Sequence, residues 1–470
     1  MTKEEIIALI KREVVPAMGC TEPMAVSLCV AYATEDLGCE PDEIQVFLSA
    51  NILKNAMGVG IPGTGMVGLP IAIALGALAG KSKYQLEVLR DVTPDDVTRA
   101  KAYIEKGGIH IQLKDNVADV MGYDEKLYIE VTCKANGQER TAIIAKEHTR
   151  RINSEDLRNR SIAGEGDSTN ATADYDNGLT LRQVYDFATQ TPIEDLDFIN
   201  EARRLNEAAA EAALRGNYGH GLGKTLSRPL GRGVMGESMF SHILSKTSAA
   251  CDARMAGAMI PVMSNSGSGN QGIAATLPVV VYAEENHNTE EEMTRALILS
   301  HLTAIYIKQS LGRLSALCGC VVASTGSSCG ITYLMGGDYE QVAYSVKNMI
   351  ANLAGMVCDG AKPSCALKVT SGVSTAILSA ILAVQNTHVS SVEGLIEDDV
   401  DRCIHNLTRL GADGMNETDK MVLDIMTHKQ VKGVKGVKEV KEVKEVKEVK
   451  GVKVVKGVKG VKGVKEVKEI

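Results

Sequence analysis

Ser161-Ile-Ala-Gly-Glu-Gly-Asp-Ser-Thr-Asn-Ala-Thr-Ala-Asp-Tyr-Asp-Asn-Gly178 is a polar stretch that separates two parts of this chain with different sequence patterns. Few of its residues are able to anchor a hydrophobic core, and its Gly, Ser, Asn and Asp residues favour turns. We therefore interpret 153–180 as a linker between a first domain at 1–152 and a second domain at 181–429.

The part before the linker mixes the periods of helices and strands. Amphipathic spacing predicts helices, and alternation of apolar with polar residues predicts strands. Thr93-Pro94 is a helix start signal, a capping residue followed by a proline that suits the first helical position. Together these patterns predict an α+β domain with helices at 4–14, 23–36 and 94–106 and strands at 43–50, 109–114, 126–133 and 140–147.

The part after the linker has helical spacing interrupted by Gly-rich turns. This spacing predicts helices at 181–187, 195–215, 291–317, 339–357, 371–384 and 400–410. The predicted fold is therefore an α+β N-terminal domain and a mainly α-helical C-terminal domain, followed by a low-complexity C-terminal tail at 430–470.

The tail repeats Val-Lys-Gly or Val-Lys-Glu from Val431 onward. Its thirteen Lys and six Glu give a charge of +7, so the net charge of −8 leaves −15 on the rest of the chain. A period of three fits neither a helix nor a strand, and the lysines favour solvation. We expect the tail to be disordered or loosely helical, with no catalytic part. An electrostatic tether for acidic surfaces is the alternative.

The composition argues against several classes of protein. A formal charge of −8 gives no general attraction to nucleic acid, and four Phe with no Trp leave few rings on which bases stack. The charged, amphipathic N-terminal segment does not have the pattern of a secretory signal, so we expect a cytoplasmic protein. In that reducing compartment the eleven cysteines are expected to be free thiols or metal ligands.

Three uncharged runs, at 56–80, 255–283 and 314–337, are long enough to cross a bilayer. Each contains a loop of small or polar residues whose backbone would lack hydrogen-bond partners in lipid, and the chain lacks the Trp expected at the interfaces. We therefore expect no membrane partner, and interpret the runs as Gly-rich helices packed in a buried core.

Cys20 lies in Gly19-Cys20-Thr21-Glu22-Pro23, just before a predicted helix. The helix dipole favours an anion at this position, so the sequence predicts a lowered pKa for the thiol. A thiolate there acts as a base, a nucleophile or a metal ligand. The alternative is that Cys20 is a small hydrophobic residue of a core, which is the common fate of a free cysteine.

Five of the eleven cysteines fall between Cys318 and Cys365. The spacing from Cys358 to Cys365 is too wide for a zinc-ribbon knuckle, and no second pair matches it. An iron–sulfur cluster tolerates such loops, and three cysteine ligands leave one iron open to a substrate. Buried thiols in a Gly-rich core are the alternative.

Asn265-Ser-Gly-Ser-Gly-Asn-Gln-Gly272 precedes an apolar stretch. Backbone N–H groups of a Gly/Ser loop at a helix start bind a carboxylate as well as a phosphate. Lys54 is a cation near a further Gly-rich loop, Ile61-Pro-Gly-Thr-Gly65, although a turn between packed elements explains that loop equally well. Candidate substrate-binding residues are Ser266, Ser268, Asn270 and Lys54.

These motifs together resemble the L-cysteine desulfidase family. The resemblance covers about 1–425 and rests on Gly19-Cys20-Thr21-Glu22-Pro23, Lys54-Asn55 with Ile61-Pro-Gly-Thr, Ser264-Asn-Ser-Gly-Ser-Gly-Asn-Gln-Gly272, and Cys318-Gly-Cys320 with Cys358 and Cys365. That family is related to the iron–sulfur L-serine dehydratases, whose alpha chain the second domain resembles. The repeat tail has no counterpart in it.

The resemblance implies an oxygen-sensitive lyase with a four-iron four-sulfur (4Fe-4S) cluster and no pyridoxal phosphate. Such an enzyme converts L-cysteine to hydrogen sulfide, ammonia and pyruvate. Carried over to this sequence, the cluster ligands are Cys318, Cys358 and Cys365, and Cys20 is the reactive thiol near the open iron. Cys320 and, more weakly, Cys329 are alternatives to Cys318.

This assignment predicts a mechanism in which Cys20 removes the Cα proton, the loop at 264–272 holds the carboxylate, and the open iron binds the substrate sulfur. A soft iron favours sulfur over oxygen only modestly, so an iron–sulfur L-serine dehydratase or deaminase is the nearest alternative. A non-catalytic amino-acid-binding module is a third interpretation. The expected partner is a small amino acid, and long apolar helices are compatible with a homodimer.

Overall fold

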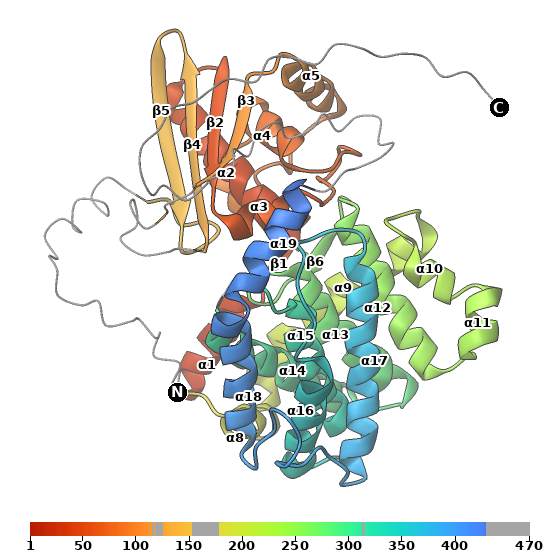
Figure 1. The fold of residues 1–470 in the computed structure, drawn as a ribbon. Helices are drawn as coiled ribbons and strands as arrows, with labels where there is room; N and C mark the ends of the chain where they lie inside the picture. The colour runs from red at the N-terminus through yellow and green to blue at the C-terminus, as the bar shows by residue number, and fades with distance from the viewer. Residues whose placement is uncertain (115–116, 118–125, 153–177, 313–314, 429–470) are drawn as a thin grey trace, which may run out of the picture. The chain divides into compact units, whose positions relative to one another are not determined.

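The computed structural model describes residues 1–114, 117, 126–152, 178–312 and 315–428. Most of the predicted linker, and the repeat tail, lie outside the described residues. Contacts join Met1–Lys429 into one compact unit. Figure 1 shows that the N-terminal residues of this unit form a sheet with helices, and that the rest is mainly helical. The predicted fold class is therefore confirmed.

The N-terminal part contains a four-stranded sheet in the order β3-β2-β4-β5. Its strands are β2 (Glu43–Leu48), β3 (Ile109–Leu113), β4 (Tyr128–Ala135) and β5 (Gln138–Ala145). The pair β2 and β3 is parallel, and the other two pairs are antiparallel. Buried and partly buried residues alternate along β2, because one face of the sheet packs on helices.

Helices cover that face in two layers. α2 (Thr21–Leu37) packs against β4 and β5, and α4 (Leu69–Leu78) packs on α2. α5 (Pro94–Glu105) packs on α4 and begins with the predicted Thr93-Pro94 signal, since the Thr93 hydroxyl accepts a hydrogen bond from the Asp96 amide. A short helix, α3 (Ala50–Ala56), follows β2.

The start of the chain is tied to the helical part. Ile6, Leu9 and Ile10 of α1 (Lys3–Glu13) belong to the hydrophobic core formed by the later helices. β1 (Pro16–Met18) pairs antiparallel with β6 (Pro261–Met263). This pairing brings Cys20, two residues after β1, next to helices that lie more than two hundred residues further along the chain.

The helical part is built around α15 (Gly319–Leu334), which contacts four other helices. These are α13 (Gly269–Glu285), α14 (Glu290–Leu311), α16 (Tyr339–Leu353) and α17 (Cys365–Val384). A Cβ at Gly326 would lie 2.2 Å from the carbonyl oxygen of Ser300, so glycine lets α15 approach the α14 backbone. The remaining helices are α8 (Leu181–Gln190), α9 (Asn200–Arg215), α10 (Leu222–Leu226), α11 (Pro229–Met235), α12 (Met239–Met255), α18 (Val400–Arg409) and α19 (Asn416–His428).

The spacing of apolar residues predicted none of α12, α13 and α15, although α15 and most of α13 lie in the uncharged runs at 314–337 and 255–283 that we interpreted as Gly-rich helices of a buried core. Nearly every residue of α15 is buried, including Ser324, Thr325 and Ser328. A helix that is buried on all sides has no polar face, so its sequence carries no helical period to detect. The predicted helix at 291–317 also ends earlier, at Leu311, where Gly312 has a φ of +84°.

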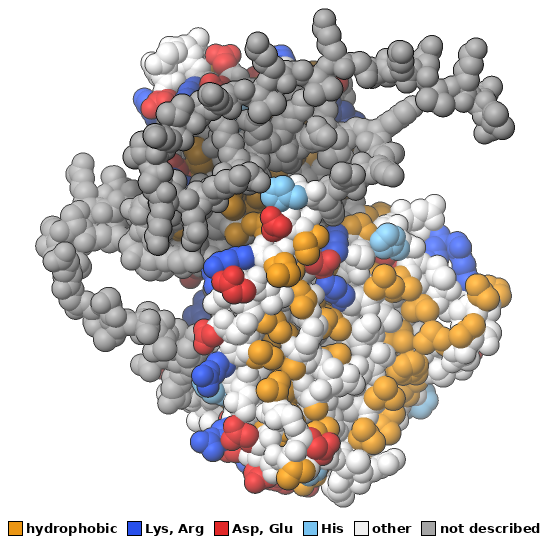
Figure 2. All heavy atoms as spheres, in the orientation of Figure 1, with side chains coloured by type: hydrophobic (Ala, Val, Ile, Leu, Met, Phe, Trp, Pro, Cys, Tyr) orange, Lys and Arg blue, Asp and Glu red, His pale blue; other side chains and the backbone are white. Residues whose placement is uncertain are grey.

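Among the described residues one helix, α17, is long and apolar enough to cross a membrane by length and composition. Half of the tested window (50%) is buried inside the protein, and a buried core helix passes the same test. The other side of α17 exposes Leu367, Leu378, Ile381 and Leu382. Figure 2 shows hydrophobic side chains on this surface of the helical part. The run at 255–283 is not one helix, because β6 and a loop precede α13.

Candidate functional site

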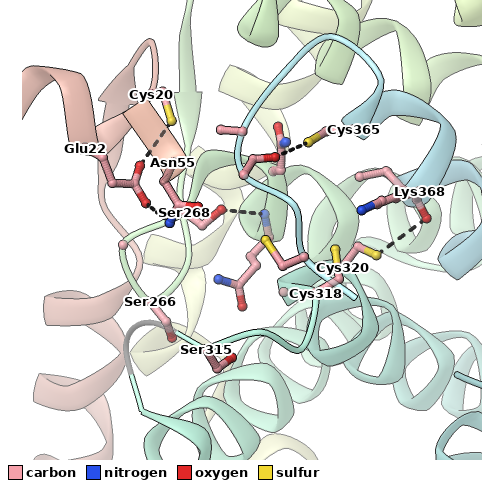
Figure 3. A pocket seen from close by; sticks show the side chains of 18 of the residues that line it. Cys20, Glu22, Asn55, Ser266, Ser268, Ser315, Cys318, Cys320, Cys365 and Lys368 are labelled. Carbon is pink, nitrogen blue, oxygen red and sulfur yellow. Dashed lines mark hydrogen bonds between the residues drawn. The ribbon is translucent and has the colours of Figure 1, made fainter. Parts of the chain in front are cut away.

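A cavity of about 110 Å³ lies between the start of α2 and the helical part. Its walls include all of the predicted site residues except Lys54, namely Cys20, Ser266, Ser268, Asn270, Cys318, Cys358 and Cys365. Figure 3 shows Cys20 on one side of the cavity, with Cys318, Cys320 and Cys365 on the other. The structure therefore brings together motifs that are widely separated in the sequence.

Lys54 does not line the cavity. Its side chain is 1% exposed, and its ammonium group pairs with the carboxylate of Asp419 on α19. Asn51 donates a second hydrogen bond to the same carboxylate. A buried ammonium group needs a counter-ion, and here the counter-ion comes from the last described helix. The structure thus gives Lys54 a role in attaching α19 to α3.

Cys20 is the N-cap residue of α2, as its position before a helix predicted. The predicted direction of its pKa shift is wrong. Burial raises the pKa of the thiol well above its usual value, and the nearby Glu22 carboxylate raises it further, while Arg254 acts in the opposite direction. Desolvation disfavours the thiolate more than the helix dipole favours it. In this structure Cys20 is therefore a neutral thiol at neutral pH.

The Cys20 thiol has an acceptor for its proton. Its Sγ donates a hydrogen bond to Glu22 Oε2 at 3.1 Å, and Asn55 Nδ2 donates to Glu22 Oε1 at 3.0 Å. Figure 3 shows these three side chains together at the cavity. Glu22 and Asn55 were not among the predicted site residues, although both stand within the motifs around Cys20 and Lys54. The sequence signal that could have identified Glu22 is its position two residues after a cysteine at a helix start.

The predicted anion loop connects β6 to α13. The hydroxyl of Ser268 caps α13 by accepting a hydrogen bond from the Gln271 amide at 3.5 Å. Ser266 has a φ of +48° and donates its hydroxyl hydrogen to Asn265 Oδ1 at 2.9 Å. Both serines line the cavity, and both also stabilise the shape of the loop.

A buried histidine supports this loop from behind. Asn265 Nδ2 lies 3.1 Å from His301 Nδ1, and Thr276 Oγ1 lies 3.0 Å from His301 Nε2. Thr276 donates its own hydroxyl hydrogen to the Gly272 carbonyl, so it accepts from Nε2–H, and Nδ1 accepts from Asn265. Burial lowers the pKa of His301 to about 3. A neutral imidazole therefore fixes Asn265, and through it Ser266.

The cysteines on the opposite wall are positioned by backbone pairing. Leu317 and Val357 form an antiparallel bridge, and the Cys358 amide donates to the Ala316 carbonyl at 2.6 Å. This pairing places Cys318 beside Cys358, and a hydrogen bond with the Cys318 thiol is the main cause that raises the pKa of Cys358. Burial raises the pKa of Cys365, and the neighbouring Cys358 thiol contributes to that rise.

Two helix N-termini point toward this group of thiols. Cys318 is the N-cap of α15, and Cys365 is the first residue of α17. Burial lowers the pKa of the Lys368 ammonium group, one turn into α17, but a hydrogen bond to the Asp359 carboxylate raises it overall, with smaller contributions from the nearby Cys318 and Cys358 thiols. Helix N-termini and a nearby cation stabilise thiolates, which are the form of cysteine that binds metals.

Among the described residues no group of three Cys, His, Asp or Glu side chains is arranged to hold a single metal ion. This arrangement does not suit a structural zinc ion, for which four ligands converge on one atom. In an iron–sulfur cluster each cysteine binds a different iron, so the ligand sulfurs surround the cluster instead of meeting at one point. Three thiols on one wall of a cavity, with positive helix ends behind them, fit a cluster of that kind.

The alternative ligands have other contacts. Cys320 donates to Met356 Sδ at 3.2 Å and to the Lys368 carbonyl at 3.5 Å. Cys329 is fully buried inside α15 and does not line the cavity. Cys251 of α12 is a buried thiol that was not among the predicted site residues. Burial is the main cause that raises its pKa, and the neighbouring Cys365 and Cys318 thiols add to that rise.

Comparisons with known proteins show which family this chain is similar to. A family model described as "Serine dehydratase alpha chain" matches residues 83–424. A "UPF0597 protein" of Phocaeicola vulgatus is 67% identical over 430 residues, which is 91% of this chain and 98% of the relative. Similar proteins of Bacteroides fragilis and Oleidesulfovibrio alaskensis are 65% and 45% identical, over 91% and 90% of this chain and 98% of each relative.

The names of these relatives state no activity. The motifs resemble the L-cysteine desulfidases and the related serine dehydratase alpha chains, and the comparisons support only the second of these families. The matched segment spans most of the helical part and the cysteines of the cavity wall. This chain therefore belongs to the serine dehydratase alpha chain family.

Proposed function

We propose that this protein is a lyase that eliminates the side-chain group of a small β-substituted amino acid, with L-cysteine as the preferred substrate. The observation that carries the proposal is the arrangement of Cys20 and Glu22 across a cavity from Cys318, Cys358 and Cys365, in a chain of this family. The products from L-cysteine are hydrogen sulfide and aminoacrylate, which water hydrolyses to pyruvate and ammonia.

The cofactor that fits these residues is a 4Fe-4S cluster held by Cys318, Cys358 and Cys365. When bound, it would supply a Lewis acid that polarises the bond to the leaving group. L-cysteine is proposed over L-serine because iron in a sulfur environment prefers a sulfur ligand to an oxygen ligand.

The other half of the reaction is proton transfer. The Cα–H bond breaks as the Cβ–S bond breaks, and the proton from Cα goes to a base on the enzyme. Cys20 serves as that base when its own proton has moved to Glu22, to which it is already hydrogen-bonded. Asn55 holds the Glu22 carboxylate in place for this transfer. The cavity excludes bulk water from the step because Cys20 is only 2% exposed.

L-serine is the second candidate substrate, and the family description favours it. The same proton transfer with loss of hydroxide would give pyruvate and ammonia from L-serine. The two candidates differ only in the leaving group, so relative turnover decides between them.

Anaerobic purification followed by iron and acid-labile sulfide analysis tests the cofactor. Sulfide release from L-cysteine and pyruvate formation from L-serine, assayed side by side, test the reaction. We expect a brown protein that releases sulfide, loses activity in air, and is inactive as Cys20→Ala. The matched control is Cys39→Ser, because Cys39 is exposed and does not line the cavity. An iron-free preparation with full activity, or an iron-loaded one without turnover of any amino acid, would refute the proposal.

A further inference from the structure

Arg254 of α12 is a buried cation in the wall of the cavity. Its side chain is 3% exposed, and no carboxylate among the described residues forms an ion pair with it. Its Nε is also buried without a hydrogen-bond partner in that part of the chain. A buried charge without a counter-ion carries a large desolvation cost. A bound anion would offset this cost by forming an ion pair with the buried guanidinium group.

The loop at the start of α13 leaves room for this arginine. A Cβ at Gly269, the first residue of α13, would lie 2.2 Å from Arg254 Nε and 2.9 Å from Arg254 Cζ. Any other residue at Gly269 would therefore displace the guanidinium group. The predicted anion loop thus provides a place for a buried arginine, which is a much stronger carboxylate ligand than the serine hydroxyls.

Oxygen atoms without partners line the same cavity. Asn55 Oδ1, Asn270 Oδ1 and Gln271 Oε1 are buried and accept no hydrogen bond from the described residues. The orientation of the Asn55 amide is set by its donation to Glu22, so its oxygen is the free atom. Carbonyl oxygens accept hydrogen bonds and suit an ammonium group. Among the described residues, Arg254 therefore gives the cavity a cation without an ion-pair partner, and the three side-chain oxygens give it unpaired acceptors.

We propose that Arg254 binds the α-carboxylate of the substrate, and that the side-chain oxygens of Asn55, Asn270 and Gln271 receive its ammonium group. Arg254 and the ammonium acceptors then select a zwitterionic amino acid over a simple thiol, amine or acid. This inference rests on the proposed function, because it concerns the same cavity. It moves the carboxylate contact from the serines of the loop to a residue that the sequence analysis did not consider.

A different role for the charge of Arg254 has to be separated from this one. Burial raises the pKa of both Cys20 and Cys251, and the charge of Arg254 offsets part of that rise, so the guanidinium group also acts on neighbouring thiols. If an effect on the thiols were the whole role of Arg254, replacing Arg254 would change the affinity for every ligand by a similar factor. Carboxylate recognition instead predicts an effect that depends on whether the ligand carries a carboxylate.

The test is calorimetric titration of the anaerobically prepared holoenzyme with L-alanine, ethylamine and propionate. L-alanine has the carboxylate and ammonium groups without a leaving group, and the other two probes lack one group each. For Arg254→Gln we expect a loss of affinity for L-alanine and propionate of at least about thirtyfold, as for truncation of a buried charge pair. Affinity for ethylamine should change by less than about threefold.

Gly269→Ala is the second variant, since it displaces the guanidinium group while keeping its charge. It should weaken L-alanine binding in the same direction, whereas Gly233→Ala, with no atom within 4 Å of its Cβ, should not. The melting temperature of Arg254→Gln should not fall, because no ion pair within the described chain is lost. Equal losses for L-alanine and ethylamine, or no L-alanine binding by the wild-type protein, would overturn the inference.

These measurements need no turnover, so they are independent of the proposed reaction. Binding of L-alanine that depends on Arg254, without sulfide release from L-cysteine, would retain the carboxylate site and reject the elimination. Sulfide release from L-cysteine by the wild type, with unchanged L-alanine binding in Arg254→Gln, would retain the elimination and reject the carboxylate site.

Discussion

The thiol of Cys20 donates a hydrogen bond to the carboxylate of Glu22, with 3.1 Å between Sγ and Oε2. This contact lies inside the first turn of α2 and faces the cavity. Burial and the Glu22 charge keep Cys20 protonated, and the same carboxylate is the nearest acceptor for that proton. In the proposed reaction the two residues would form a proton-transfer pair, in which Cys20 becomes basic only as Glu22 takes up its proton.

We predict that Glu22→Gln lowers the turnover number by about a hundredfold or more, because a positioned acid or base contributes at least that factor. The glutamine keeps the hydrogen bond to Asn55 but cannot accept a proton. Anaerobic steady-state kinetics with L-cysteine measure this, with Glu87→Gln, an exposed surface acid, as the control.

The double variant Cys20→Ala with Glu22→Gln shows whether the two residues act as one unit in turnover or act independently. Residues that act as one unit give losses that do not add. The double variant should then be no more than about threefold slower than the worse single variant. Losses that multiply would show that Glu22 acts without Cys20.

Replacing any one of Cys318, Cys358 and Cys365 with serine should reduce the iron content per chain to less than half that of the wild type, measured after anaerobic purification. Serine keeps the shape of the side chain but is a poor ligand for iron compared with a thiolate. Cys320→Ser and Cys329→Ser should retain iron, since Cys320 is engaged by Met356 and Cys329 lies within the α15 core. Iron loss in Cys320→Ser, with retention in Cys318→Ser, would reassign the ligand.

Gly326→Ala should destabilise the protein by about 2 kcal/mol, the typical cost of forcing extra volume into a packed core. The added methyl group would lie 2.2 Å from the Ser300 carbonyl oxygen on α14, which is backbone and cannot rotate away. Gly233→Ala in α11 is the matched control, because its Cβ meets no atom and alanine favours a helix. Urea unfolding measures both free energies, and equal stability of the two variants would contradict the close packing of α14 and α15.

The stability of the protein should fall as the pH drops below about 6.5, partly because of His301. The unfolded imidazole takes up a proton near its usual pKa of about 6.5, whereas burial keeps the folded one neutral until about pH 3. The unfolded state therefore binds more protons between these values, and stability is lost as pH falls through this window. At pH 5 the protonation of His301 in the unfolded state lowers the free energy of unfolding by about 2 kcal/mol.

Urea unfolding at pH 7 and pH 5 tests this, with His301→Gln compared with the wild type. Between pH 7 and pH 5 the free energy of unfolding of the variant should fall by about 2 kcal/mol less than that of the wild type, because the variant lacks the imidazole of His301. The carboxylates contribute equally to both proteins. His110→Gln serves as the control, since His110 is exposed on β3 and should keep the wild-type slope. If the free energy of unfolding of His301→Gln depended on pH as that of the wild type does, His301 would not be a buried neutral group.

Most of the amphipathic elements could be predicted from the sequence. The strand β2 and the helices α1, α5 and α16 lie within a few residues of their predicted bounds, because each has one buried face and one solvent face. The cysteines of the cavity wall and Cys20 could also be found, since their local motifs carry the family resemblance. Arg254 could not be found, because a lone arginine in a helix normally lies at the surface.

The sequence by itself determined which segments are amphipathic, where Thr93 caps a helix, and that Cys20 stands at a helix start, because these depend on neighbouring residues along the chain. Only the tertiary structure decided that Cys20 is a protonated thiol beside Glu22, that Lys54 pairs with Asp419, and that Arg254 lies in the cavity wall without an ion-pair partner among the described residues. Charge state and pairing depend on burial and on distant partners, and these are set by how the elements pack.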